Sequence, residues 1–272
     1  MSSYENYSQT AKNYDATRVP SGIEVILGAI TTGPVSINQA RVLDAGCGTG
    51  SYSTVMAHYV AQVYAVDLNR EMLAIAKEKL PSHVLIQQAS IECLPFEDRI
   101  FDAIMVNQVL HHISDDPQSD YPLTRKVFFE LARVLKTDGR LTINTCGQDQ
   151  LSWGWWYYHL IPNALADVRA RYIPIDALCR LLNEAGFNVD QRYIPMDALI
   201  QGEDYFNPRG PLSLSWRNGD SIWACASAQE LQEAIDKIQT IDRENGMEGY
   251  MCQHDVTRGR YGQLTFVLAS RR

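Results

Sequence analysis

The 272-residue chain lacks several features that define whole classes of protein. It has no apolar run of about 18 residues, which excludes a membrane-spanning helix of the usual kind. Its net charge is −8, so we expect no surface that binds the phosphate backbone of DNA or RNA. Its first residues, Met1 to Asn6, lack the basic and apolar regions of a secretory signal peptide. No internal repeat or low-complexity tract interrupts the chain.

The six cysteines are scattered, and no two of them form a C-x-x-C pair. This spacing does not fit a zinc site or a disulfide framework, and it is typical of reduced thiols in a cytoplasm. We therefore expect a cytoplasmic protein that holds no metal. The sequence leaves its oligomeric state open.

Runs that favour strands alternate with helical patterns through the first half of the chain. The expected strands are 41–45, 62–67, 83–88, 101–106 and 140–145, and the expected helices are 51–59, 70–80 and 121–135. This order predicts an α/β domain with a mostly parallel sheet and helices on both faces. In the second half we expect helices at 175–185 and 226–243, strands at 187–194 and 262–270, and loops over 197–225.

The most informative stretch is residues 42–50, Val-Leu-Asp-Ala-Gly-Cys-Gly-Thr-Gly. It predicts a buried strand, an acid at its end (Asp44), a glycine-rich turn and a helix N-terminus, which together are typical of a nucleotide-type ligand site. Asp67 ends the next predicted strand, where an acid can accept hydrogen bonds from ribose hydroxyls. The alternative is a tight strand–helix connection without a ligand.

The same stretch favours one cofactor over another. A dinucleotide fingerprint would place its third glycine at position 51, where this chain has Ser51. S-adenosylmethionine (SAM) carries a sulfonium and an ammonium group but no phosphate. A carboxylate at Asp44 suits those cations and would repel a pyrophosphate. SAM is therefore favoured, with a capping or turn role for Asp44 as the alternative.

Over about residues 40–146 the chain resembles the class I SAM-dependent methyltransferases, and in character the UbiE-like small-molecule group. The resemblance rests on five segments in order: motif I at 42–50, the ribose-binding strand at 63–68, the adenine-bracketing segment at 89–96, motif IV at 101–107 and a helix–turn–strand at 131–141. It implies a Rossmann-like seven-stranded sheet with six parallel strands and an antiparallel last strand. It also implies an N-terminal lid (1–34) and a methyltransferase domain (35–272), in which an insertion at 197–260 covers the substrate.

The resemblance implies cofactor contacts at ten positions near the strand ends: Asp44, Gly46, Cys47, Gly48, Asp67, Leu68, Met72, Ser90, Ile91 and Asn107. The glycine turn would lie along the amino-acid part of SAM, Asp67 would hold the ribose, and Asn107 would line the methionine side. Ser90 would meet the adenine edge, although the family often has an aspartate at that position. For Met72 and Ile91, ordinary packing is the alternative.

The N-terminal segment resembles the lid of related enzymes. Tyr14 and Arg18 belong to its Tyr-Asp-x-x-Arg element. They would close over the methionine part of SAM, with the Arg18 guanidinium reaching its carboxylate. The alternative is a docking helix that covers the core.

Two further groups of residues are candidates for the substrate side. His111 and His112 follow the fourth predicted strand, and a histidine can accept a proton near neutral pH. We expect His111 to be a general base and His112 its support, with a structural role for both as the alternative. The aromatic segment 153–159 is expected to form a substrate wall or a piece of core, and its candidate residues are Trp153, Trp156, Tyr157 and His159.

The sequence therefore predicts a methyltransferase that moves the sulfonium methyl of SAM to a small-molecule acceptor, aromatic or amine-bearing, and releases S-adenosylhomocysteine (SAH). Two alternatives stay open: a nicotinamide-dependent oxidoreductase, which shares the sheet and the glycine turn, and a non-catalytic SAM-binding protein. The acceptor atom is not specified, because oxygen, nitrogen, carbon and sulfur acceptors share this framework.

Overall fold

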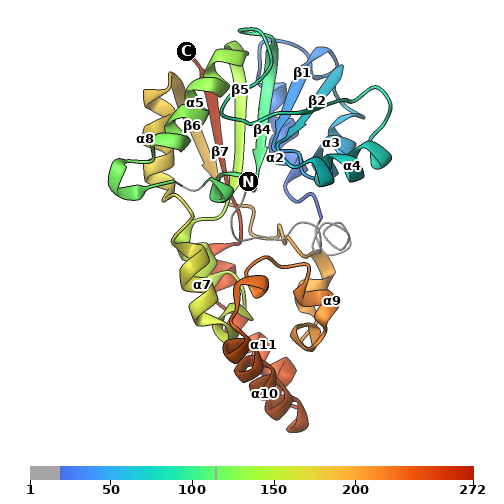
Figure 1. Cartoon of the computed structure of the whole chain (residues 1–272), viewed down its shortest axis with the longest axis vertical. Coiled ribbons are helices and arrows are strands. Elements are labelled where there is room, and N and C mark those ends of the chain that lie inside the picture. Colours follow the sequence, from blue (N-terminus) through green and yellow to red (C-terminus); the bar gives the residue numbers. More distant parts are fainter. Residues whose placement is uncertain (1–18, 114) are drawn as a thin grey trace.

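The computed structural model describes residues 19–113 and 115–272 and is built around a seven-stranded sheet with the order β3-β2-β1-β4-β5-β7-β6. Its strands are β1 (Arg41–Ala45), β2 (Gln62–Asp67), β3 (Leu85–Gln88), β4 (Phe101–Asn107), β5 (Leu135–Thr145), β6 (Phe187–Tyr193) and β7 (Thr265–Arg271). Only β7 is antiparallel to its neighbours, β5 and β6 (Figure 1). The predicted fold class, with six parallel strands and an antiparallel last strand, is confirmed.

Helices cover both faces of the sheet. The α-helices of residues 19–113 and 115–272, some of which lie in a lobe away from the sheet, are α2 (Ile23–Thr31), α3 (Ser51–Met56), α4 (Arg70–Lys79), α5 (Pro122–Val134), α6 (Gln148–Trp153), α7 (Pro162–Arg169), α8 (Ile175–Glu184), α9 (Leu214–Arg217), α10 (Ala228–Arg243), α11 (Met247–Asp255) and α12 (Arg258–Tyr261). Alternate residues of a strand point to opposite faces, so Val42 packs with α2, α3 and α4, whereas Leu43 packs with α5 and α8.

The chain reverses its direction across the sheet between β1 and β4. From β1 it proceeds outward through β2 to β3, and it then returns to β4 on the other side of β1. Loops leave the carboxyl ends of β1 and β4 in opposite directions, which opens a crevice where α/β sheets bind ligands. In Figure 1 this edge of the sheet faces the lobe that contains α7, α9, α10 and α11.

That lobe, formed by residues 155–172 and 197–261, is called the cap below. Its core is aromatic: the indole of Trp156 donates a hydrogen bond to the Tyr205 carbonyl at 2.9 Å, and the Tyr157 and Trp216 rings meet edge to face. A buried carboxylate links two of its helices, because Glu230 of α10 accepts hydrogen bonds from the first backbone N–H groups of α7. The cap core is continuous with the core on one face of the sheet.

The helix-to-strand turn before β5 differs from its prediction. The sequence places a helix up to Leu135, a turn at Asp138-Gly139 and a strand from Arg140. In the structure the helix ends at Val134, and Leu135 is already paired with Phe101 of β4. Leu135 is completely buried in the core beside α5, and this burial favours the strand pairing.

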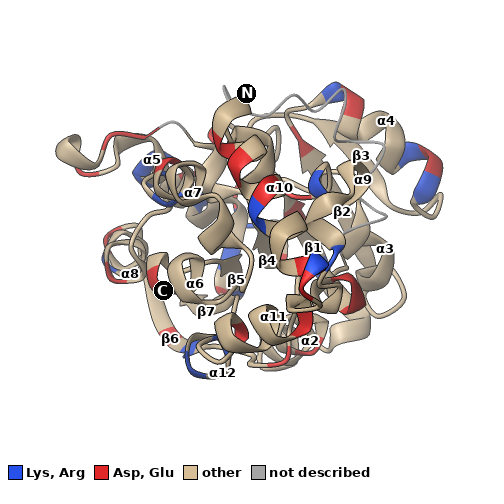
Figure 2. Ribbon diagram, turned by 90° about the horizontal axis from the view of Figure 1, so that it is seen from below, with Lys and Arg blue, Asp and Glu red and all other residues tan. Residues whose placement is uncertain are grey.

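Charged residues of both signs are mixed over the surface seen from the cap side (Figure 2). No helix among residues 19–113 and 115–272 is long and apolar enough to cross a membrane. All six cysteines are free thiols.

Candidate functional site

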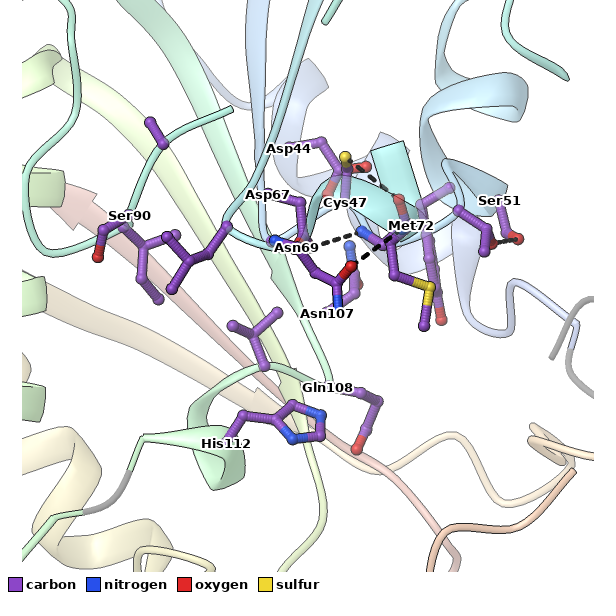
Figure 3. A pocket seen from close by; sticks show the side chains of 18 of the residues that line it. Asp44, Cys47, Ser51, Asp67, Asn69, Met72, Ser90, Asn107, Gln108 and His112 are labelled. Carbon is purple, nitrogen blue, oxygen red and sulfur yellow. Dashed lines mark hydrogen bonds between the residues drawn. The ribbon is translucent and has the colours of Figure 1, made fainter. Parts of the chain in front are cut away.

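A cavity of about 710 Å³ lies at the carboxyl ends of β1, β2 and β4. Its volume is within the ~300–1,000 Å³ that is typical of small-molecule sites. The structure brings together around it the ten cofactor positions that were predicted near the strand ends: Asp44, Gly46, Cys47, Gly48, Asp67, Leu68, Met72, Ser90, Ile91 and Asn107. Figure 3 shows several of these side chains around the cavity.

The glycine turn after β1 needs its glycines for two different reasons. Gly46 has φ +86°, and a Cβ at this position would lie 2.4 Å from Cγ2 of Val109. Gly48 also has a positive φ, +55°, but a Cβ there would meet nothing within 4 Å. The first glycine lets the turn pack against the segment after β4, and the second leaves bare backbone beside the cavity, where a ligand can approach closely.

Asp44 is a buried carboxylate with one unsatisfied oxygen. Its side chain is 1% exposed, and its Oδ2 accepts a hydrogen bond from the Ser53 hydroxyl at 2.7 Å. Its Oδ1 has no hydrogen-bond partner within the described part of the chain. Burial raises the pKa of Asp44 to about 7, and the neighbouring charge of Asp67 acts in the same direction. A cationic group in the cavity would provide the missing partner and favour the ionised carboxylate.

Asp67 is held in place by backbone N–H groups on both sides. Its Oδ2 accepts from Gly48 and its Oδ1 from Asn69, each at 2.8 Å. Asn69 in turn caps α4 by accepting hydrogen bonds from the N–H groups of Glu71 and Met72. Burial raises the pKa of Asp67. The carboxylate is thus fixed between the glycine turn and the start of α4, with the cavity beside it.

Asn107, the last residue of β4, has a polar side chain that is also unsatisfied. It is buried, and neither its amide nitrogen nor its amide oxygen has a hydrogen-bond partner in residues 19–113 and 115–272. Buried polar atoms are nearly always hydrogen-bonded in folded proteins. Asn107 and Asp44 both line the cavity, so together they present two acceptors and one donor group to a ligand.

Known proteins share this part of the chain. A family model described as "Methyltransferase domain" matches residues 43–143. The uncharacterized methyltransferase YcgJ of Bacillus subtilis is 39% identical over 39% of this chain and 40% of its own length. The ubiquinone/menaquinone biosynthesis C-methyltransferase UbiE of Francisella tularensis subsp. novicida is 34% identical over 38% of this chain and 41% of its own. The aligned region is therefore less than half of either relative.

Residues 43–143 are thus the part of the chain that matches a methyltransferase domain in sequence. The likeness of fold extends further than the likeness of sequence. A crystal structure from Anabaena variabilis, described as a methyltransferase of an antibiotic biosynthesis pathway, superposes with a TM-score of 0.72. It is 22% identical and covers 93% of this chain and 98% of the Anabaena chain, so the cap is included in the shared fold. The predicted resemblance to class I methyltransferases is confirmed.

His111 and His112, the two histidines that follow β4, face different cavities. Their rings are in contact, with centroids 4.1 Å apart, and the His111 ring stacks on Tyr172. His112 lines the 710 Å³ cavity, whereas the buried His111 lines a separate cavity of about 20 Å³ between the sheet and the cap. The base role predicted for His111 stays a prediction, but the side chain in the larger cavity is that of His112.

The predicted aromatic wall does not line the 710 Å³ cavity. Trp156 and Tyr157 are completely buried in the cap core, Trp153 is 43% exposed, and the His159 ring lies 4.9 Å from the ring of His254. Their neighbours in the same segment, Trp155 and Tyr158, line the 20 Å³ cavity instead. The predicted lid residues Tyr14 and Arg18 lie outside the described residues.

Sequence reasoning missed a set of polar residues on the β4 and β5 side. Gln108, Asn144 and Tyr52 all line the 710 Å³ cavity and are joined by hydrogen bonds. It also missed Ser53, the hydroxyl partner of Asp44. The one available signal was position: Gln108 follows the predicted contact Asn107 directly, and Ser53 lies in the first turn of the helix after the glycine turn.

Proposed function

We propose that the protein is a SAM-dependent methyltransferase that transfers the sulfonium methyl to a small-molecule acceptor and releases SAH. The observation that carries this proposal is the pair of buried side chains at the cavity with unsatisfied polar atoms, Asp44 and Asn107. The amino-acid part of SAM has an ammonium for the Asp44 carboxylate and a carboxylate for the Asn107 N–H group. A pyrophosphate would instead bring negative charge beside Asp44.

The remaining proposed cofactor contacts lie at and after the carboxyl ends of β2 and β3, farther from Asp44 along the sheet. Asp67 is placed to accept hydrogen bonds from the ribose hydroxyls, and Leu68 and Met72 to flank the adenine. The Ser90 hydroxyl, which accepts a hydrogen bond from the Glu92 N–H at 3.2 Å, is placed at the adenine edge. Bound SAM supplies the electrophilic methyl group. We assign His112, which lines the same cavity, to the acceptor side, where its imidazole would take a proton from an acceptor that carries one.

The division into an N-terminal lid (1–34) and a catalytic domain (35–272) with a covering insertion (197–260) belongs to the same proposal. It is supported by Val19, Pro20 and Ile200, which line the cavity from these two segments. The backbone N–H of Val19 donates to the Ile200 carbonyl at 3.0 Å, so the two segments meet at the cavity. The six free thiols support a cytoplasmic location.

Calorimetric titration of the purified protein with SAM and SAH tests the cofactor, and a parallel titration with NADH followed by fluorescence tests the alternative. We expect both adenosyl ligands to bind and NADH not to bind. Binding of NADH without binding of SAM would overturn the proposal. Release of SAH in the presence of an acceptor separates an enzyme from a non-catalytic SAM-binding protein.

A further inference from the structure

Gln108 lies at the boundary between two cavities. None of the ten proposed cofactor contacts near the strand ends lines both of them. Gln108 follows β4, and its side chain lines both the 710 Å³ cavity and the 20 Å³ cavity. Its backbone has φ +54°, a conformation that is uncommon outside glycine. The backbone N–H donates to the Asn144 carbonyl at 2.8 Å, which fixes the residue to the end of β5. Figure 3 shows Gln108 and His112 on the same side of the cavity, across from Asp44 and Asp67.

A chain of hydrogen bonds fixes the orientation of the Gln108 carboxamide. The Tyr52 hydroxyl donates to the Ser21 carbonyl at 3.0 Å, and a carbonyl can only accept. The Tyr52 oxygen therefore accepts the bond from Asn144 Nδ2, also at 3.0 Å. This turns Asn144 Oδ1 toward Gln108, whose Nε2 donates to it at 3.1 Å. The amide oxygen of Gln108 consequently points away from Asn144.

The Gln108 carboxamide keeps hydrogen-bonding capacity after these contacts. A carboxamide has two N–H donors and an oxygen with two acceptor sites. Among residues 19–113 and 115–272, one N–H bonds to Asn144, and the oxygen accepts only a weak S–H hydrogen bond from Cys146 at 3.6 Å. One N–H and one acceptor site remain for a second molecule. A hydroxyl group, which both donates and accepts, matches this pair.

The surroundings of Gln108 favour an uncharged partner. The charged residues that line the cavity come from β1 and β2 and from the segments after β2 and β3: Asp44, Asp67, Arg70, Glu71 and Glu92. From β4 onward the described lining consists of branched apolar side chains, the amides Asn107, Gln108 and Asn144, and His112. An anionic or cationic group there would lose hydration, and the described lining from β4 onward contains no carboxylate, lysine or arginine to pair with it.

We propose that Gln108 selects the acceptor by holding an uncharged hydroxyl on an apolar body, with the amide oxygen accepting from the O–H and the remaining N–H donating to its oxygen. This inference rests on the proposed methyltransferase function and adds the acceptor class to it. In the transfer, a lone pair of the hydroxyl oxygen forms the C–O bond, and the S–CH₃ bond breaks with its electron pair going to sulfur. As the C–O bond forms, the hydroxyl proton leaves its hydrogen bond to the Gln108 amide oxygen and passes to the imidazole of His112, which lines the same cavity, so the products are a methyl ether and SAH.

Three probes with the same pentylphenyl body and different charge test this proposal: 4-pentylphenol, 4-pentylbenzoate and the 4-pentylbenzylammonium ion. Each is titrated by calorimetry into the SAH-loaded protein. We expect the phenol to bind about tenfold more tightly than either charged probe, because two hydrogen bonds of ordinary strength distinguish them. Equal binding of all three probes, or binding of none, would overturn the inference.

Variants of Gln108 separate its role from that of the rest of the cavity. Gln108→Leu should weaken binding of the phenol about threefold to tenfold and leave the two charged probes as in the wild type. Leucine is preferred to valine because a β-branched residue is strained at positive φ. Gln108→Glu should reverse the preference toward the ammonium probe. Gln232→Leu, an exposed position on α10, is the matched control and should change neither value.

SAH affinity and the melting temperature of each variant distinguish the possible failures. If SAH does not bind to the wild-type protein, the proposed function fails and this inference with it. If SAH binds and Gln108→Leu is folded but keeps the full preference for the phenol, the function stands and the role of Gln108 is wrong.

Discussion

The proposed pairing of Asp44 with the ammonium group of SAM predicts that SAM binding depends on pH, because the pKa of this carboxyl is raised. The Asp44 carboxyl is buried and its pKa is raised to about 7, so in the ligand-free protein about half of the molecules carry a proton there at pH 7. The ammonium group of SAM interacts favourably with the ionised form only. Binding therefore requires the proton to leave, and the apparent affinity must fall as the pH is lowered through 7.

The size of the effect follows from the protonated fraction. With a pKa of about 7, the ionised fraction falls from about one half at pH 7 to about one tenth at pH 6. The dissociation constant of SAM should therefore rise about fivefold over that unit and about tenfold over the next. The amino group of the ligand remains protonated below its own pKa of about 8, so the change in this window belongs to the protein.

Calorimetric titration with SAH at pH 7.0, 6.5, 6.0 and 5.5 measures this dependence without turnover. The Asp44→Asn variant, which removes the titrating group, should bind SAH more weakly at pH 7 and lose most of the pH dependence. Any slope that remains reports on Asp67, whose pKa is also raised by burial. A wild-type affinity that stays constant between pH 7 and pH 5.5 would refute the pairing of Asp44 with the ammonium group.

Three further variants test the site. Asp67→Ala removes the acceptor of two backbone N–H groups and of the ribose hydroxyls, so SAH affinity measured by calorimetry should fall at least tenfold. Gly46→Ala should lower stability in urea unfolding by roughly 2 kcal/mol or more, because its Cβ would collide with Val109, whereas Gly249→Ala in open space on α11 should not. Asp44→Asn should raise the melting temperature at pH 8 but not near pH 4: a raised pKa makes the wild type lose stability as the pH rises through 7, by up to on the order of 4 kcal/mol.

The sequence was sufficient for the sheet and for the grouping of the strand-end residues around one cavity, because both depend on local patterns. Residues 42–50 carry the strand, the acid and the glycine turn within one short stretch, and the structure brings Asp44 and Gly48 to the cavity with Asp67. The alternation of strands and helices likewise predicts a mostly parallel sheet with helices on both faces. These features need no knowledge of distant contacts.

The acceptor side was harder to predict because distant segments determine it. The neighbours His111 and His112 line different cavities, and which one faces the larger cavity depends on a ring stack with Tyr172 far along the chain. The orientation of Gln108 depends on Asn144 and Tyr52, which belong to a different strand and a helix.

The roles of the aromatic residues in the cap were also hard to predict from the sequence. The aromatic residues Trp156 and Tyr157 were candidates for a substrate wall or a piece of core, and the structure buries them against Tyr205 and Trp216. No local pattern distinguishes these two roles, because both require large apolar rings. Helix α11 was missed for a related reason: it has little amphipathic character, and only Met247 is buried along its nine residues.

The most direct test of the central claim is the formation of SAH when the protein is incubated with SAM and a library of small-molecule acceptors. We predict that SAH forms in proportion to the amount of enzyme, that its formation requires an acceptor, and that the Asp67→Ala variant loses most of it. Failure to produce SAH with any acceptor, by a protein that is folded and oxidises NADH instead, would contradict the account.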